Sequence, residues 1–73
     1  MKLRQTFAEN LARTRREKGL SQEELGLEAG VDRSYVSLLE RGKFSASLDK
    51  IELLAKALGV EPVALLAKSA KKR

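Results

Sequence analysis

The stretch from residue 21 to residue 42 carries a glycine, Gly26, in the middle of a run of strong helix formers. A glycine inside a helix costs roughly 1 kcal/mol relative to alanine. That cost is accepted where a second helix comes too close for a larger side chain, as happens when two helices cross steeply over a short turn. Gly26 therefore predicts two short helices joined by a tight turn.

Capping signals mark the ends of both helices. Ser21 is followed three residues later by a glutamate, which makes a capping box at the start of the first helix. Gly30 can adopt the left-handed backbone that ends a helix, and Asp32 is a good N-cap for the next one. We therefore expect helices over about residues 22–29 and 33–41.

Three further helices are predicted on similar grounds. Residues 2–18 have apolar side chains that recur three and four positions apart, as on one face of a helix. Ser47 is an N-cap for a fourth helix, whose apolar stripe ends at Gly59. Pro62 fits the first turn of a fifth helix. The chain is therefore predicted to form an all-α domain of five helices.

The length of the chain, 73 residues, suits one domain. We expect residues 1–67 to form that domain, and residues 68–73 to be a disordered tail with four of the fifteen basic residues and no acidic one. The tail can attract phosphates or only increase solubility. A core of this size is marginal alone, so we also expect a homodimer.

Composition argues against several classes of protein. The chain has no histidine, no cysteine and no glycine-rich phosphate loop, so we expect no enzyme, no cofactor, no metal and no small-molecule ligand. It has no apolar run of membrane-spanning length and no signal peptide, which predicts a cytoplasmic protein with no membrane partner. The net charge of +5 lies mostly in the last six residues. A nucleic-acid partner must therefore be argued from individual positions.

Residues 21–42 resemble the helix-turn-helix of the Cro and phage-repressor family, also called the XRE family. The matching residues are Gln22, Leu25, Gly26, Gly30, Val31, Val36, Ser37, Leu39, Glu40 and Gly42. The family usually has alanine in place of Gly26. The resemblance covers residues 7 to about 66 and implies a lambda-repressor-like DNA-binding domain with the helix-turn-helix at its second and third helices.

Residues 32–37, with the sequence Asp-Arg-Ser-Tyr-Val-Ser, are similar to the small controller proteins of restriction–modification systems. This similarity implies a homodimeric transcriptional regulator that binds double-stranded DNA at a palindromic operator and controls its own synthesis, as activator or repressor. The alternatives are a phage-type repressor or an antitoxin of the same fold, and a protein–protein adaptor that does not bind DNA.

Six residues are expected to contact DNA. The second helix of such a motif enters the major groove and contacts base edges with its N-terminal residues, where Arg33 can form paired hydrogen bonds with guanine. For each residue the alternative is an ordinary surface role, and the Tyr35 ring can instead close the core. The expected DNA contacts are Gln22, Arg33, Ser34, Tyr35, Ser37 and Lys43, with Gln22 and Lys43 on phosphates.

Arg15 is a charged residue on the apolar face of the first predicted helix, where it needs a partner if it is buried. The family resemblance implies a structural pair between Arg15 and Glu40. The alternative is that the Arg15 side chain extends over the edge of the core into solvent. Phe44, in the loop that follows, is expected to anchor that loop in the core.

The last two predicted helices carry more large apolar side chains than so short a segment can bury alone. We expect part of this surface to form the dimer interface. The alternative is that the same residues close the core of a single chain. The predicted interface residues are Leu54, Leu58, Val60, Val63, Leu65 and Leu66.

Overall fold

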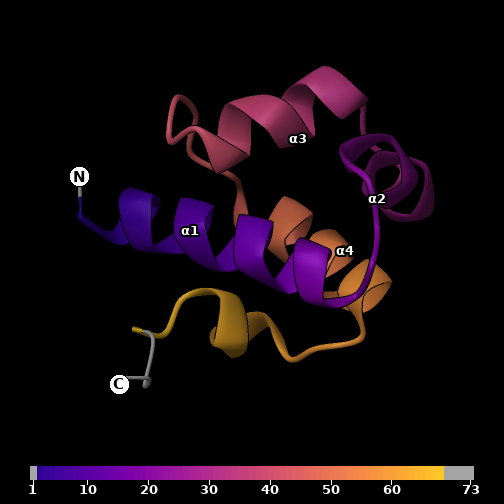
Figure 1. The fold of residues 1–73 in the computed structure, drawn as a ribbon. Coiled ribbons are helices and arrows are strands. Elements are labelled where there is room, and N and C mark those ends of the chain that lie inside the picture. The colour runs from indigo at the N-terminus through magenta and orange to yellow at the C-terminus, as the bar shows by residue number, and fades with distance from the viewer. Residues whose placement is uncertain (1, 69–73) are drawn as a thin grey trace.

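The computed structural model describes residues 2–68, which form four α-helices and one 3-10 turn (Figure 1). The elements are α1 (Lys2–Glu17), α2 (Gln22–Ala29), α3 (Arg33–Glu40), α4 (Leu48–Leu58) and η1 (Pro62–Leu65). No strand occurs in the described part of the chain, and the predicted all-α fold is confirmed. Residues 69–73, which belong to the predicted basic tail, lie outside the described residues.

Helix α1 crosses the middle of the molecule, with α3 on one side and η1 on the other (Figure 1). Helix α2 packs against both α3 and α4. Each element contributes one leucine without any exposed surface, namely Leu11, Leu25, Leu39, Leu54 and Leu65. Burying one such side chain contributes about 1.5–3 kcal/mol. All five elements therefore share one core, and the small domain depends on every one of them.

The segment after α4 forms a 3-10 turn where a fifth α-helix was expected. Its backbone bonds span three residues, as in the bond from the Ala64 amide to the Glu61 carbonyl (2.9 Å). The buried Asn10 side chain of α1 donates both N–H groups of its Nδ2 atom, to the carbonyls of Leu65 (2.9 Å) and Ala67 (2.7 Å). Two carbonyls that could continue a helix are thus bound to α1 instead.

Three residues of the predicted dimer interface lie in the core of the single chain. Leu54, Leu58 and Leu65 are at most 2% exposed, so a second chain has no surface of theirs to cover. That part of the prediction is wrong, because the stripe on α4 packs against α2 and η1. Val63 is 68% exposed, whereas Val60 and Leu66 are half-buried.

The Phe44 side chain is half-exposed and does not anchor the loop in the core, contrary to expectation. Its ring instead meets the half-buried ring of Tyr35 edge-on, with the ring centroids 6.4 Å apart. Tyr35 packs against the core, so the contact joins Phe44 to the edge of the core through the Tyr35 ring.

The turn between α2 and α3 is built around Gly26. Gly30 adopts the left-handed conformation (φ 77°), and the amides of Gly30 and Val31 both donate to the Gly26 carbonyl, at 2.8 and 2.9 Å. A Cβ atom on Gly26 would lie 2.7 Å from the Val31 carbonyl oxygen and 3.4 Å from the Arg33 amide nitrogen. The expected close approach is present, and the group that comes close is the backbone of the turn and of the first residue of α3.

We expect Gly26→Ala to lower the free energy of unfolding by about 1 kcal/mol. Crowding a packed site costs about 1–3 kcal/mol, and the higher helix propensity of alanine recovers only about 1 kcal/mol of this. Urea denaturation followed by circular dichroism measures the change. Leu27→Ala, at an exposed neighbouring position, is the control and should change stability by less than about 0.5 kcal/mol. A gain in stability for Gly26→Ala would contradict the close contact.

Candidate nucleic-acid interface

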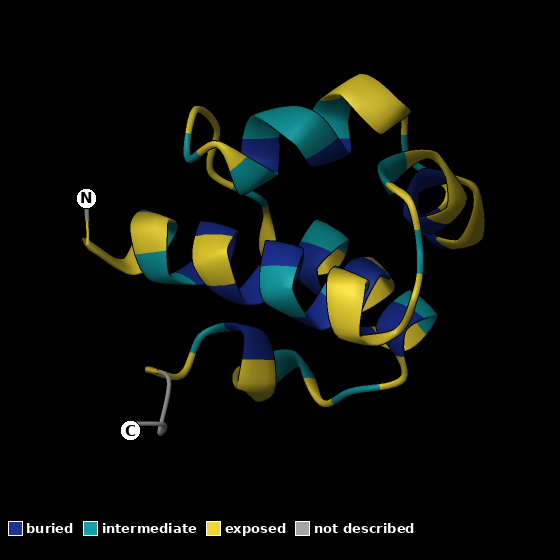
Figure 2. Cartoon of the chain, in the orientation of Figure 1, coloured by how far each residue is buried: buried dark blue, intermediate teal, exposed yellow. Residues whose placement is uncertain are grey.

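Helix α3 has one face in the core and one face in solvent (Figure 2). Val36 and Leu39 are buried on the inner face. Arg33 and Ser34 are exposed at the N-terminal end, and Ser37 lies half-buried one turn further along. The structure therefore brings three of the predicted DNA-contacting residues onto the outer side of one short helix.

Asp32 caps α3 and binds Ser34 through two groups. The Ser34 amide donates to the Asp32 Oδ2 atom (2.9 Å), and the Ser34 hydroxyl donates to the same oxygen. These bonds, with the hydroxyl bond the stronger cause, hold the pKa of the Asp32 carboxyl below its usual value. The Ser34 hydroxyl proton points to Asp32 in this arrangement, which leaves the hydroxyl oxygen free to accept a hydrogen bond from a ligand.

The loop after α3 carries the exposed Lys43. The Arg4 Nε atom, near the start of α1, donates to the Ser45 hydroxyl in this loop (3.1 Å). The preceding residue, Phe44, has its ring edge-on to the ring of Tyr35. The Tyr35 ring helps to close the core, which was the alternative to a DNA contact for this residue.

The structure joins Arg15 of α1 to Glu40 at the end of α3. The Arg15 Nε atom lies 2.6 Å from Glu40 Oε2, and Arg15 Nη2 lies 3.1 Å from Glu40 Oε1. The Arg15 Nη1 atom donates to the Leu20 carbonyl (2.8 Å). The two side chains are only 11% and 5% exposed, and the bond to Glu40 raises the pKa of Arg15. The guanidinium is thus ionised and held by three hydrogen bonds.

Gln22 is a third member of this group. Its Nε2 atom, at the first residue of α2, donates to Glu40 Oε1 (3.0 Å). Sequence analysis missed this bond because its partners are 18 residues apart and meet only when α2 and α3 cross as they do here. Glu40 therefore connects α1, α2 and α3 through one carboxylate.

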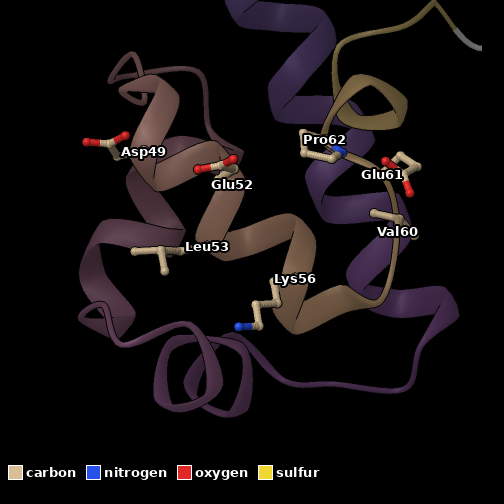
Figure 3. A pocket seen from close by; sticks show the side chains of 7 residues that line it. All are labelled: Asp49, Glu52, Leu53, Lys56, Val60, Glu61 and Pro62. Atoms are coloured by element: carbon tan, nitrogen blue, oxygen red, sulfur yellow. The ribbon is translucent and has the colours of Figure 1, made fainter.

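A shallow groove of about 620 Å³ lies between α4 and residues 60–62 (Figure 3). Its apolar members are Leu53, Val60 and Pro62, and its charged members include Glu52 and Lys56. Leu53 is 42% exposed and was missed in the sequence, because it falls outside the apolar stripe of α4. We call this surface the α4–η1 groove.

Other kinds of site were sought in residues 2–68. Among these residues there is no group of three histidine, cysteine, aspartate or glutamate side chains that could hold a metal ion. Within the same residues no helix is long and apolar enough to cross a membrane. The outer face of α3 with its supporting polar contacts is the candidate nucleic-acid interface.

Two helices that meet over a tight turn, with the second one exposed along its polar face, define a helix-turn-helix protein. Comparisons with known proteins agree. Residues 11–65 match the family model described as helix-turn-helix. The chain is 44% identical over 66 residues to the uncharacterized HTH-type transcriptional regulator y4dJ of Sinorhizobium fredii, across 90% of this chain and 86% of that protein.

Two restriction–modification proteins are also similar. The control protein C.BamHI of Bacillus amyloliquefaciens is 43% identical over 65 residues, which cover 88% of this chain and 80% of that protein. The crystal structure of the controller protein C.AhdI from Aeromonas hydrophila superimposes with a TM-score of 0.83 at 47% identity, over 85% of this chain and 94% of that one. The chain belongs to the Cro and phage-repressor (XRE) family of DNA-binding transcriptional regulators, which are not enzymes.

We expect Arg15→Met to lower the free energy of unfolding by about 3–5 kcal/mol, because it leaves the Glu40 carboxylate buried without its charge partner. Thermal and urea unfolding measure the loss. Arg13→Met is the matched control on the same helix, since Arg13 is paired with Glu17 at 3.9 Å on an exposed surface. Such pairs contribute about 0.5 kcal/mol. Equal effects of the two variants would show that the buried pair has no special importance.

Proposed function

We propose that the protein is a sequence-specific regulator that binds double-stranded DNA as a homodimer at a palindromic operator. We further propose that it is an autoregulatory controller of a restriction–modification system, with residues 1–67 as the whole binding and dimerisation unit. The similarity to C.BamHI and C.AhdI supports the controller role. The observation that supports DNA reading is that Arg33 and Ser34 are exposed at the N-terminal end of α3, while Val36 and Leu39 on its other face are buried in the core.

Base recognition is assigned to the outer face of α3. Arg33 is exposed at its first residue, where it can form paired hydrogen bonds with O6 and N7 of guanine. The Ser34 hydroxyl donates to Asp32, so toward DNA it acts as an acceptor for the amino group of cytosine or adenine. Ser37, one helical turn after Arg33, would reach further along the major groove of the DNA. Tyr35 would lie near the DNA phosphates at the edge of that groove.

Phosphate binding is assigned to both flanks of α3. The start of α2 presents unpaired amides and the positive end of the helix, together with the Gln22 side chain. Lys43 is exposed on the opposite flank, in the loop that Arg4 and Ser45 hold together. Phosphate contacts on both sides of the DNA major groove would fix the position of α3 relative to the bases.

We propose the α4–η1 groove, together with the exposed Val63 of η1, as the dimer interface. An isologous interface uses the same surface on both chains, so Glu52 of one copy can face Lys56 of the other. The chain is 32 Å along its longest axis. Two α3 helices that read half-sites one DNA turn apart must lie roughly 34 Å from each other, a distance similar to the length of one chain.

The first experiment is a gel shift with the DNA immediately upstream of the gene, over a range of protein and salt concentrations. We expect a discrete complex at about nanomolar protein that salt weakens and that scrambled DNA does not form. Equal, weak binding to both duplexes would count against autoregulation. A second protein that purifies with the chain would instead favour the antitoxin alternative.

On that operator, Arg33→Ala should weaken binding about 10- to 100-fold, which corresponds to one paired arginine–guanine contact. Arg33→Lys is the matched control, because lysine keeps the charge but cannot form the paired bonds. We expect it to retain affinity for random DNA and to lose discrimination between the operator and random DNA. Full operator discrimination in either variant would contradict the role of Arg33.

Val63→Asp should convert the dimer into a monomer in sedimentation velocity runs, because a charge would be buried in the apolar part of the interface. The control is Leu27→Asp, at an equally exposed apolar residue on α2, which should leave the dimer intact. A dimer that persists in Val63→Asp would place the interface elsewhere.

A further inference from the structure

Gln22 is bound at one N–H group and has no second hydrogen bond within the described part of the chain. We infer that Glu40 is a positioning residue for DNA binding: it fixes the side-chain amide of Gln22 so that the second N–H of that amide is presented to a DNA phosphate. This inference rests on the proposed DNA-binding function. It assigns to Glu40 a role beyond its pair with Arg15.

The chemistry of Glu40 determines which end of the Gln22 amide faces it. An ionised carboxylate only accepts hydrogen bonds, so the amide nitrogen must point to Glu40 Oε1 at 3.0 Å. The reversed amide would put two oxygen atoms at that separation and would be repelled. One N–H is therefore directed at Glu40, and the other N–H of the same planar group faces away from it.

The anchor for this amide is rigid. The Glu40 side chain is 5% exposed and receives two further bonds from Arg15, which itself donates to the Leu20 carbonyl. A glutamine at a helix start is otherwise free to change rotamer. Because Glu40 removes that freedom in the unbound protein, less freedom is lost when DNA binds.

The second N–H of Gln22 lies at the start of a helix that already has unpaired donors. The Glu24 amide is used by the Ser21 hydroxyl (3.0 Å), whereas the amides of Gln22 and Glu23 have no partner within the helix because of their position. Three N–H groups at one helix start can bind a phosphate together. The side-chain N–H adds a donor that the backbone alone lacks.

Arg15 is needed for this arrangement as well. An unpaired carboxylate beside the start of α2 would repel a phosphate, but the Arg15 guanidinium neutralises Glu40 at 2.6 Å. The pair therefore supplies an oriented acceptor for Gln22 without adding a net negative charge to the DNA-facing surface.

The first test measures side-chain motion in the full-length protein without DNA, by the ¹⁵N heteronuclear NOE of its side-chain amides. Asn10, buried with both N–H groups bonded, is the rigid reference. Gln5, exposed on α1, is the mobile reference. We expect the NOE of Gln22 to resemble that of Asn10. A Gln22 amide as mobile as that of Gln5 would overturn the inference, whatever happens in the variants.

The second test is a double-mutant cycle on DNA affinity. A random-sequence duplex at low salt is the probe, because phosphate contacts do not depend on sequence. Gln22→Met should weaken binding about fivefold for each bound protomer, as expected for the net contribution of one solvent-exposed hydrogen bond. In Glu40→Gln the new amide can both donate and accept, so it no longer selects one orientation of the Gln22 amide. We therefore expect a similar loss of DNA affinity. The double variant should then lose no more than about twofold beyond either single variant.

Affinities are compared only at temperatures where circular dichroism shows each variant to be folded. Additive losses, about 25-fold in the double variant, would show that Glu40 acts on stability alone and would overturn the inference. Unchanged affinity in Gln22→Met would overturn it too. If Glu40→Gln does not fold, the NOE of the Gln22 side-chain amide in the wild-type protein decides whether the inference holds. Failure of the proposed function looks different: the wild-type protein would then bind no duplex, or would bind all duplexes equally.

Discussion

The Arg15–Glu40 pair ties the end of α3 to α1. Helix α3 has eight residues and buries only Val36 and Leu39, which alone would leave its rotation about its own axis poorly fixed. A carboxylate at its last residue, held by a guanidinium from α1, restricts that rotation. A buried ion pair adds little net stability because both charges lose their hydration, but its geometry is demanding. We therefore infer that the pair matters chiefly for the orientation of α3.

The second constraint is the lack of space between α2 and the turn. At Gly26 the backbone of the turn comes so close that no side chain fits without a shift. This contact fixes the distance between α2 and α3, as the ion pair fixes the angle of α3. Together they hold the exposed residues Arg33 and Ser34 on a rigid support, and preorganised groups of this kind lose little freedom on binding.

Local signals in the sequence were enough to find α2 and α3, because caps, glycines and apolar spacing act within a few residues. Contacts between distant segments were harder to predict. The bond from Gln22 to Glu40 and the two bonds of Asn10 depend on how helices cross, and no spacing rule indicates them. The α4 leucines exposed a different limit: an apolar stripe shows that a face is covered, but not whether the same chain or a second chain covers it. The 3-10 turn η1 was also missed, because the Asn10 bonds that hold it come from a distant segment.

The two bonds of Asn10 have a mechanical consequence. They fasten η1 to α1, and α1 in turn packs against α3, so packed contacts connect the proposed dimer surface to α3 without a break. In a dimer formed through η1, no hinge or flexible linker would lie between the two α3 helices. The distance between the two α3 helices would then be fixed by the fold. DNA whose half-sites are spaced differently would then have to bend or twist to fit the protein.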